Sequence, residues 1–262
     1  MEPLISNDGS SPVRDAASAQ ANLGRQYDYV TTRRFDPPEG VLERHRILGP
    51  HSDPAVADAY RILRTQVLQR MDGNRWNALA VVSPNAGEGK TTTAINLALS
   101  IARDPEHSAL LVDMDLRAPG VAACFGLTAQ PNLLDHLRKG VPLSEVLVNP
   151  GLERLLLLPT SASPLDSSEI IASRRSQELL AELRSRYADR IVVYDVPPLL
   201  LCDDGLALLP QVDVVLMVAR DGVTRREDLS RALELLGDKP VLGVLLNGAR
   251  DARRHYVSVK KP

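Results

Sequence analysis

With 262 residues, 44% of them hydrophobic, the chain is long enough for one α/β domain with a sizeable core and flanking tails. Its net charge of −2 gives no overall preference for nucleic acid or for a membrane surface. No apolar run approaches the roughly 20 residues of a membrane-spanning helix, and "MEPLISNDGSSPVRD" at the amino terminus lacks the apolar core of a signal peptide. The two cysteines, Cys124 and Cys202, have no metal-binding spacing, which indicates reduced thiols in a cytoplasmic protein.

The first part of the chain shows little periodicity. Residues 1–52 are rich in Ser, Ala, Asp, Arg and Pro, and breaker sequences such as "FDPPEG" and "GPHSDP" occur near their end. We therefore expect a disordered amino-terminal arm. It contains two tyrosines, Tyr27 and Tyr29.

A helix is predicted to follow, over "DPAVADAYRILRTQVLQRM", with Asp53 as its cap and Pro54 in its first turn. The sequence "DGN" is expected to end it. Three charged residues, Asp58, Arg61 and Arg64, step by three and form one ridge of this helix. Such a ridge is either a solvated flank or a contact between subunits, and the spacing alone favours the flank. An apolar stripe at helical spacing lies beside the ridge: Val56, Ala59, Tyr60, Leu63, Val67 and Met71.

The rest of the domain alternates strand and helix. Continuous apolar runs, typical of parallel strands covered on both faces, are "ALAVVS", "ALLVDMD", "RLLLLP", "RIVVYDV", "VDVVLMVA" and "PVLGVLL". Helices are predicted over "KTTTAINLALSIAR", "SSEIIASRRSQELLAELRSRY" and "RREDLSRALELLG", the second one opened by a capping box of Asp166 and Glu169. Residues 53–249 are thus expected to form a doubly wound, mostly parallel sheet with helices on both faces and ligands at the carboxyl ends of the strands.

A phosphate-binding loop is predicted between the first strand and its helix, in "VVSPNAGEGKTTTAINLA". Backbone N–H groups of such a loop point at phosphates, and glycine lets the backbone approach them. Lys90 is expected to bind the outer phosphates and the Thr91 hydroxyl to hold Mg²⁺. The sheet is then of the P-loop NTPase type, although Pro84 replaces the usual first glycine. The expected nucleotide-binding residues are Gly87, Glu88, Gly89, Lys90, Thr91 and Thr92.

Carboxylates end two other buried strands. Asp113 and Asp115 in "LLVDMDLRAP" lie on one side of a strand by its period of two. Such a pair near a phosphate can bind a metal ion or accept a proton from an attacking hydroxyl. Asp195 in "RIVVYDVPP" stands where a second carboxylate for Mg²⁺ is expected. The alternative for all three is a structural role at a strand end.

The end of the chain offers two weaker signals. Asn247, just after the last strand, is a candidate contact to a nucleobase, although Asn is also a common turn residue. Residues 250–262 form a basic, flexible tail with one tyrosine, Tyr256. Such a tail can touch anionic lipid or an acidic partner, or remain solvated.

The segments "SPNAGEGKTT", "LLVDMDLRAP" and "IVVYDVPP" occur in the order of the Walker A, A′ and B motifs of bacterial tyrosine kinases. The chain most resembles the cytoplasmic autokinases of capsule and exopolysaccharide synthesis. This resemblance implies ATP and Mg²⁺ as cofactors and transfer of the γ-phosphate to tyrosine. It also implies that Asp113 orients or deprotonates the tyrosine hydroxyl, while Asp115 and Asp195 hold the metal.

The helix sequence "DAYRILRTQ" resembles the E-x-x-R-x-x-R oligomerisation motif of the same family, with Asp58 in the Glu position. The resemblance therefore favours the subunit contact, and it implies a ring-like homo-oligomer without nucleic acid. It further implies a separate membrane chain-length-determinant (co-polymerase) protein. That partner recruits the kinase to the inner face of the plasma membrane and supplies an activating cytoplasmic segment.

Two other functions remain open. The family's usual substrate is a carboxy-terminal tyrosine cluster, whereas this tail has only Tyr256, so Tyr27 and Tyr29 are further acceptor candidates. A non-kinase switch ATPase that controls assembly with the membrane protein is the alternative function. A partitioning-type ATPase is disfavoured, because its loop carries an additional lysine where this chain has Asn85.

Overall fold

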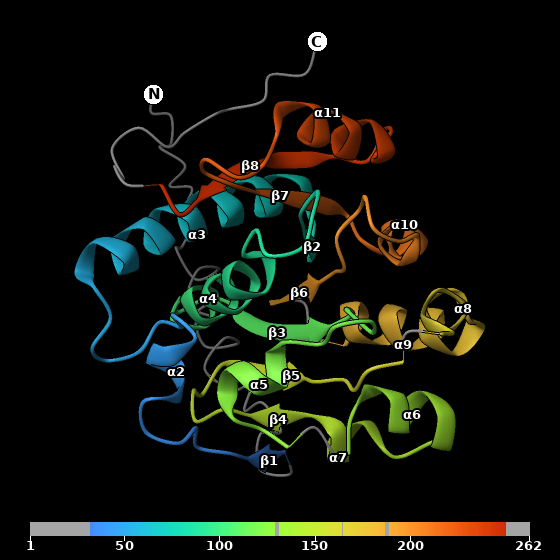
Figure 1. Ribbon diagram of the computed structural model, residues 1–262. Coiled ribbons are helices and arrows are strands. Elements are labelled where there is room, and N and C mark those ends of the chain that lie inside the picture. The colour runs from blue at the N-terminus through green and yellow to red at the C-terminus, as the bar shows by residue number, and fades with distance from the viewer. Residues whose placement is uncertain (1–31, 129–130, 164, 187–188, 250–262) are drawn as a thin grey trace, which may run out of the picture.

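The structure, a computed structural model, describes residues 32–128, 131–163, 165–186 and 189–249. Within them lies one sheet in the order β1-β4-β5-β3-β6-β2-β7-β8, in which every pairing except β4–β5 is parallel (Figure 1). This confirms the doubly wound, mostly parallel fold. The strands are β1 (Arg33–Arg34), β2 (Ala78–Val82), β3 (Ser108–Asp113), β4 (Val148–Asn149), β5 (Leu155–Leu158), β6 (Arg190–Asp195), β7 (Val214–Arg220) and β8 (Val241–Asn247).

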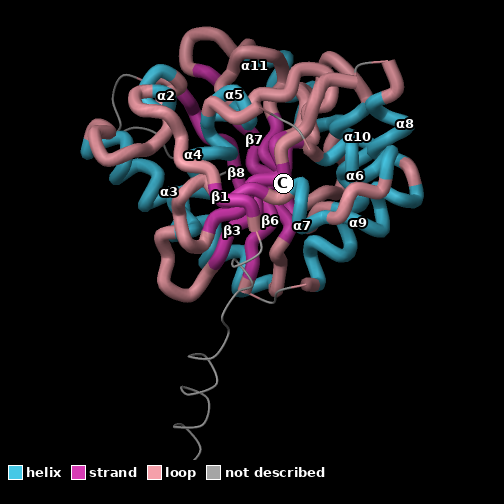
Figure 2. The backbone as a smooth tube through the Cα atoms, turned by 90° about the horizontal axis from the view of Figure 1, so that it is seen from below, coloured by secondary structure: helices cyan, strands magenta, loops and turns pink. Residues whose placement is uncertain are grey.

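Helices cover both faces of the sheet, and Figure 2 shows the strands between them. Alternate strand residues feed two cores, so that Leu79 and Val81 face one while Ala80 and Val82 face the other. Helices α3 (Pro54–Asn74), α4 (Lys90–Ala102) and α5 (Val121–Phe125) contribute to the first core. The second core receives α6 (Leu133–Lys139), α7 (Leu143–Val146), α9 (Arg174–Ser185) and α11 (Arg226–Leu235). The remaining helices are α2 (Val41–Arg44), α8 (Ser167–Ala172), α10 (Asp204–Leu208) and a 3-10 turn, Leu209–Gln211.

The expected disordered arm is wrong for residues 33–52. Strand β1 pairs with β4, and Val41, Ile47 and Leu48 are buried. The backbone N–H of Leu48 donates to the side-chain oxygen of Asn96 in α4, 2.8 Å away. A few apolar anchors and one buried hydrogen bond therefore order a segment that lacks periodicity. Tyr27 and Tyr29 lie outside the described residues.

Helix α3 begins as predicted, because the Asp53 carboxylate accepts the N–H of Ala55 and Pro54 occupies the first turn. The predicted stop was slightly early: the helix includes "DGN" and ends at Asn74. The apolar stripe is only partly correct, since Val56 is 44% exposed and Leu68, outside the stripe, is buried. No helix in the described part of the chain combines the length and apolar character needed to cross a bilayer.

The helix expected over residues 167–187 is two helices, α8 and α9, because Ser173 adopts an extended conformation between them. The hydroxyl of Ser173 accepts the N–H of Ser176 and so starts α9. The predicted capping box is wrong: the Asp166 side chain makes no cap bond and instead contacts Ser163 and Arg138. A capping box does occur in α6, between Asn132 and Asp135.

Candidate active site

Three sequence motifs meet at the carboxyl edge of the sheet. Strand β6 lies between β3 and β2, so Asp195 is the register partner of Asp113 on one side and of Val81 on the other. The loop after β2 leads directly into α4 at Lys90. The structure therefore brings the glycine-rich loop and both strand-end carboxylates together, as expected for ligands bound at this edge.

The loop from Pro84 to Lys90, called the P-loop below, depends on glycine at two positions. Gly87 and Gly89 have φ of 77° and 93°, in the left-handed region that other residues rarely adopt. A Cβ atom on Gly89 would lie 1.9 Å from the side-chain nitrogen of Asn247. That amide donates a hydrogen bond to the Glu88 carbonyl oxygen, 3.0 Å away. Asn247, predicted as a base contact, thus holds the loop backbone.

Lys90 lies among carboxylates. Its Nζ is 2.7 Å from Asp115 Oδ2, 3.4 Å from Asp195 Oδ1 and 3.3 Å from the hydroxyl of Thr91. Burial lowers the pKa of Lys90, but the charges of Asp195 and Asp115 outweigh burial and leave the pKa above its usual range. The neighbouring carboxylates therefore favour the charged form of Lys90 in the folded protein.

Asp113 is fully buried and its oxygens accept backbone N–H groups. Oδ1 accepts from Asp115, and Oδ2 accepts from Gly120 and Val121, at 3.0–3.2 Å. Burial and the charge of Asp195 raise the pKa of Asp113 well above its usual range. Asp113 thus fixes the loop between β3 and α5 and also faces the site.

Asp195 carries a buried oxygen that none of the described protein groups satisfies. Its Oδ1 faces Lys90, whereas Oδ2 has no hydrogen-bond partner in the part of the chain that the structure describes. Burial raises the pKa of Asp195, partly offset by Lys90. A buried carboxylate oxygen of this kind, close to the Thr91 hydroxyl, suits Mg²⁺, which takes only one or two carboxylates and completes its shell with water and phosphate.

The negative environment extends to Cys124 in α5. Burial, together with the charges of Asp195 and Asp113, raises the pKa of its thiol to about 11. Cys124 and Cys202 are both free thiols. Among the described residues, no group of three or more His, Cys, Asp or Glu forms a metal cluster.

The sequence analysis missed one charged pair. Arg117, just after Asp115, makes a forked contact with Asp204 at 3.0–3.2 Å, and the Asp204 side chain is fully buried. This pair ties the loop after β3 to the segment after β6. The sequence shows an arginine in "DMDLRAP" and two adjacent acids in "LLLCDDG", but no local pattern predicts that Arg117 and Asp204 form a pair across 87 residues.

The predicted ridge of α3 divides in the structure. Asp58 and Arg61 form an exposed ion pair. Arg64 instead turns inward, where it donates to the Ser100 carbonyl oxygen at 3.2 Å and lies 4.0 Å from Asp104. Arg64 therefore joins α3 to the end of α4, whereas Arg61 and Asp58 remain available on the surface.

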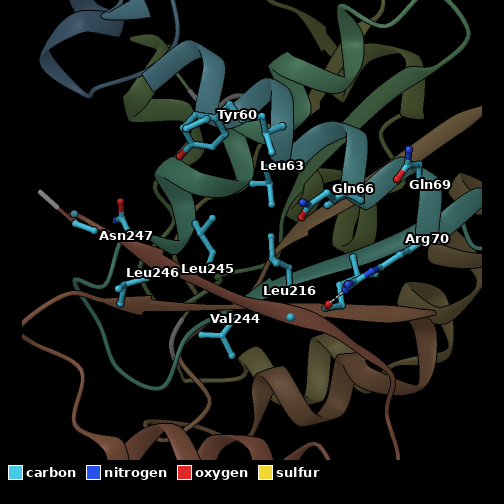
Figure 3. Close-up of a pocket in the computed structure, with 17 residues that line it drawn as sticks. Tyr60, Leu63, Gln66, Gln69, Arg70, Leu216, Val244, Leu245, Leu246 and Asn247 are labelled. Atoms are coloured by element: carbon cyan, nitrogen blue, oxygen red, sulfur yellow. Dashed lines mark hydrogen bonds between the residues drawn. The ribbon is translucent and has the colours of Figure 1, made fainter. Parts of the chain in front are cut away.

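A groove of about 590 Å³ runs between α3 and the edge strand β8 (Figure 3). Tyr60 and Leu63 of α3 face Leu245 of β8 across it, and Asn247 stands at one end. The groove therefore reaches the P-loop through Asn247. The candidate acceptor Tyr256, which follows this strand in the sequence, lies outside the described residues.

A protein-family model described as an AAA domain matches residues 77–223, more than half of the chain. The matched region contains the P-loop, Asp113, Asp115 and Asp195.

Individual relatives carry more specific names. The chain is 29% identical over 211 residues to tyrosine-protein kinase YwqD of Bacillus subtilis, a match that covers 80% of this chain and 88% of the relative. It is 27% identical to tyrosine-protein kinase ptk of Acinetobacter johnsonii over 97% of this chain but only 35% of that longer protein. Among solved structures, the kinase domain of VpsO is similar with a TM-score of 0.65 and 30% identity, covering 74% of this chain and 95% of that one.

Proposed function

Because this chain belongs to the AAA-domain family and to its bacterial tyrosine-protein kinases, we propose that it is an ATP- and Mg²⁺-dependent protein-tyrosine autokinase. Its role is to regulate polymerisation and export of a capsular polysaccharide or exopolysaccharide. The observation that carries the proposal is the position of Lys90, on the P-loop and within 3.4 Å of carboxylates from two further motifs.

The reaction is phosphoryl transfer, in which the protein acts by positioning and charge neutralisation. The P-loop backbone and Lys90 bind the β- and γ-phosphates, and the positive end of α4 favours their charge. Bound Mg²⁺ supplies further neutralisation of the phosphates. The residues that hold it are Thr91, Asp115 and Asp195, and the unsatisfied Asp195 oxygen supports this assignment. With a nucleotide bound, Lys90, which contacts Asp115 and Asp195 here, would bind phosphate oxygens.

Asp113 orients the attacking tyrosine hydroxyl and accepts its proton. Asp113 ends β3 and is the register partner of Asp195 at the end of β6. Its three backbone hydrogen bonds hold the carboxylate in one orientation, which is a requirement for a proton acceptor in a positioned reaction.

Tyr256 is the proposed phosphate acceptor, presented by a neighbouring subunit of a ring-like homo-oligomer. The exposed pair of Asp58 and Arg61 supports a subunit contact through α3. The tail that carries Tyr256 follows β8, whose last residue, Asn247, contacts the P-loop. A separate membrane chain-length-determinant protein recruits the kinase to the inner face of the plasma membrane.

A switch ATPase that controls assembly with the membrane protein is the second candidate, although the relatives named as tyrosine-protein kinases do not favour it. Phosphopeptide mapping separates the two. Wild-type protein and its Tyr256→Phe variant are incubated with ATP and Mg²⁺, and the kinase proposal expects phosphate on Tyr256 that disappears in the variant. ATP hydrolysis without phosphotyrosine, also in the presence of the membrane protein's cytoplasmic segment, would favour the switch.

A further inference from the structure

The side chain of Glu88, inside the P-loop, is buried and bonded to protein groups through both of its carboxylate oxygens. It is 1% exposed, and its Oε2 accepts the backbone N–H of Asn85 at 2.9 Å. Its Oε1 accepts the hydroxyl of Thr224 at 2.6 Å. The same hydroxyl accepts the N–H of Arg220 at 2.7 Å, which fixes its hydrogen toward Glu88.

Thr224 lies in the short segment 221–225 between β7 and α11, called the β7–α11 turn below. Two further contacts link the ends of this turn to the P-loop. The Arg220 guanidinium donates to the Gly87 carbonyl oxygen at 3.0 Å, and the Asn85 amide donates to the Asp228 carboxylate at 3.2 Å. In Figure 1, β7 and α11 both lie at the end of the sheet formed by β8.

We propose that Thr224 is a positioning residue that holds the P-loop in its phosphate-binding conformation through Glu88. A loop with two left-handed glycines has few restraints of its own, so an external contact must select one conformation. The Thr224 hydroxyl provides such a contact through its hydrogen bond to Glu88. Loss of this donor would leave the buried Glu88 carboxylate with an unsatisfied oxygen, which is unfavourable.

This inference rests on the proposed nucleotide site, and it adds a role for a residue that touches neither nucleotide nor metal. It also describes how a change at the surface of the β7–α11 turn can alter nucleotide binding at the P-loop. Val223, beside Thr224, is 57% exposed. A change in the β7–α11 turn can therefore reach the P-loop through the hydrogen bond between Thr224 and Glu88.

The test compares Thr224→Val, which keeps the shape but removes the hydroxyl, with Thr224→Ser, which keeps the hydroxyl. Binding of MgADP is measured by calorimetry, and thermal unfolding is recorded without nucleotide. We expect Thr224→Val to weaken MgADP binding by about tenfold and Thr224→Ser to stay within about twofold of wild type. Equal affinity of Thr224→Val and wild type, or equal losses in both variants, would overturn the inference.

A second pair of variants tests the contact between Asn85 and α11 in case Thr224→Val does not fold. Asp228→Ala removes the carboxylate that binds Asn85, whereas Glu227→Ala removes an exposed acid from the same turn of the helix. We expect weaker MgADP binding only in Asp228→Ala. Equal affinity of these two variants would contradict the positioning role. Because nucleotide binding is the readout, a wild type that binds MgADP but forms no phosphotyrosine, even with the membrane partner's cytoplasmic segment added, would refute the kinase proposal and leave this inference intact.

Discussion

The ammonium of Lys90 lies 2.7 Å from a carboxylate oxygen of Asp115, and the two side chains are only 9% and 4% exposed. The same ammonium faces the fully buried Asp195 at 3.4 Å. Three motifs that are far apart in the sequence are therefore joined by one buried cation. This relationship makes Lys90 a structural as well as a functional residue.

Lys90→Met should destabilise the protein as well as weaken nucleotide binding. It leaves two buried carboxylates without their cation, a change that costs about 3 kcal/mol of unfolding free energy. Urea denaturation measures this. The control is Lys139→Met, whose ammonium is also 2.7 Å from a carboxylate, that of Asp135, but is 71% exposed. The control should lose less than about 1 kcal/mol of unfolding free energy. Equal losses in the two variants would show that the Lys90 contacts stabilise the protein no more than an exposed ion pair does.

Asp113→Asn should lower phosphoryl transfer by about 100-fold or more, because an amide cannot accept the tyrosine proton. Nucleotide binding should persist, since Lys90 and the P-loop are unchanged. Asp113 accepts hydrogen bonds from the backbone N–H groups of Gly120 and Val121. Because the asparagine side chain also carries an N–H₂ donor, it cannot accept all of the hydrogen bonds that the carboxylate accepts, and we expect a lower melting temperature. Transfer is therefore measured well below that temperature, beside nucleotide affinity. Unchanged transfer would remove Asp113 from the role of base.

The end of α4 should contribute pH-dependent stability. Burial raises the pKa of Asp104, but hydrogen bonds from His107 and the Glu106 N–H outweigh it and hold the pKa below the usual range. A lowered pKa in the folded state means stability that is present above the unfolded pKa of about 4 and is lost as the pH falls through the folded value. Asp104→Asn should therefore be less stable than wild type at pH 7, by up to about 1 kcal/mol.

The stability gap between Asp104→Asn and wild type should then shrink as the pH falls below about 4. Urea denaturation at a series of pH values measures it. A gap that stays constant over the series would mean that the charge of Asp104 contributes nothing and that only its shape matters.

The two arginines of α3 should have different effects. Arg61, paired with the exposed Asp58, is free to contact a neighbouring subunit, so Arg61→Ala should reduce oligomer size with little change in stability. Arg64 satisfies a carbonyl at the end of α4, so Arg64→Ala should cost about 1 kcal/mol. Sedimentation velocity and urea denaturation measure the two effects. An unchanged sedimentation profile for Arg61→Ala would mean that Arg61 is a solvated surface residue and not part of a subunit contact.

The meeting of Lys90 with Asp115 and Asp195 at one edge of the sheet could be predicted because its sequence signals are local. Asp113 and Asp195 each end an uninterrupted apolar run, and parallel strands of one sheet bring their carboxyl ends to one edge. The P-loop has its strand before it and its helix after it. Helix α3 was recognisable from Asp53 and Pro54, which act within one turn.

The parts that were missed depend on distant contacts or on very short elements. Thr224 binds Glu88 from 136 residues away, and no local pattern marks either residue as a partner. Segment 33–52 is held partly by the hydrogen bond between Leu48 and Asn96, which are 48 residues apart in the sequence. Helices α5, α7 and α10 have four or five residues each, too few for a periodic signal. Ser173 breaks a continuous helical pattern, although serine is compatible with a helix.

The decisive experiment for the proposed autokinase asks whether the purified protein phosphorylates itself on tyrosine. Wild type and Lys90→Met are incubated with ATP and Mg²⁺ at a temperature where both are folded, and phosphate is located by peptide mass spectrometry. The autokinase proposal predicts phosphotyrosine, on Tyr256 foremost and on Tyr27 or Tyr29 otherwise, in wild type and none in Lys90→Met. Absence of phosphotyrosine from wild type that binds ATP, even with the membrane partner's cytoplasmic segment added, would contradict it.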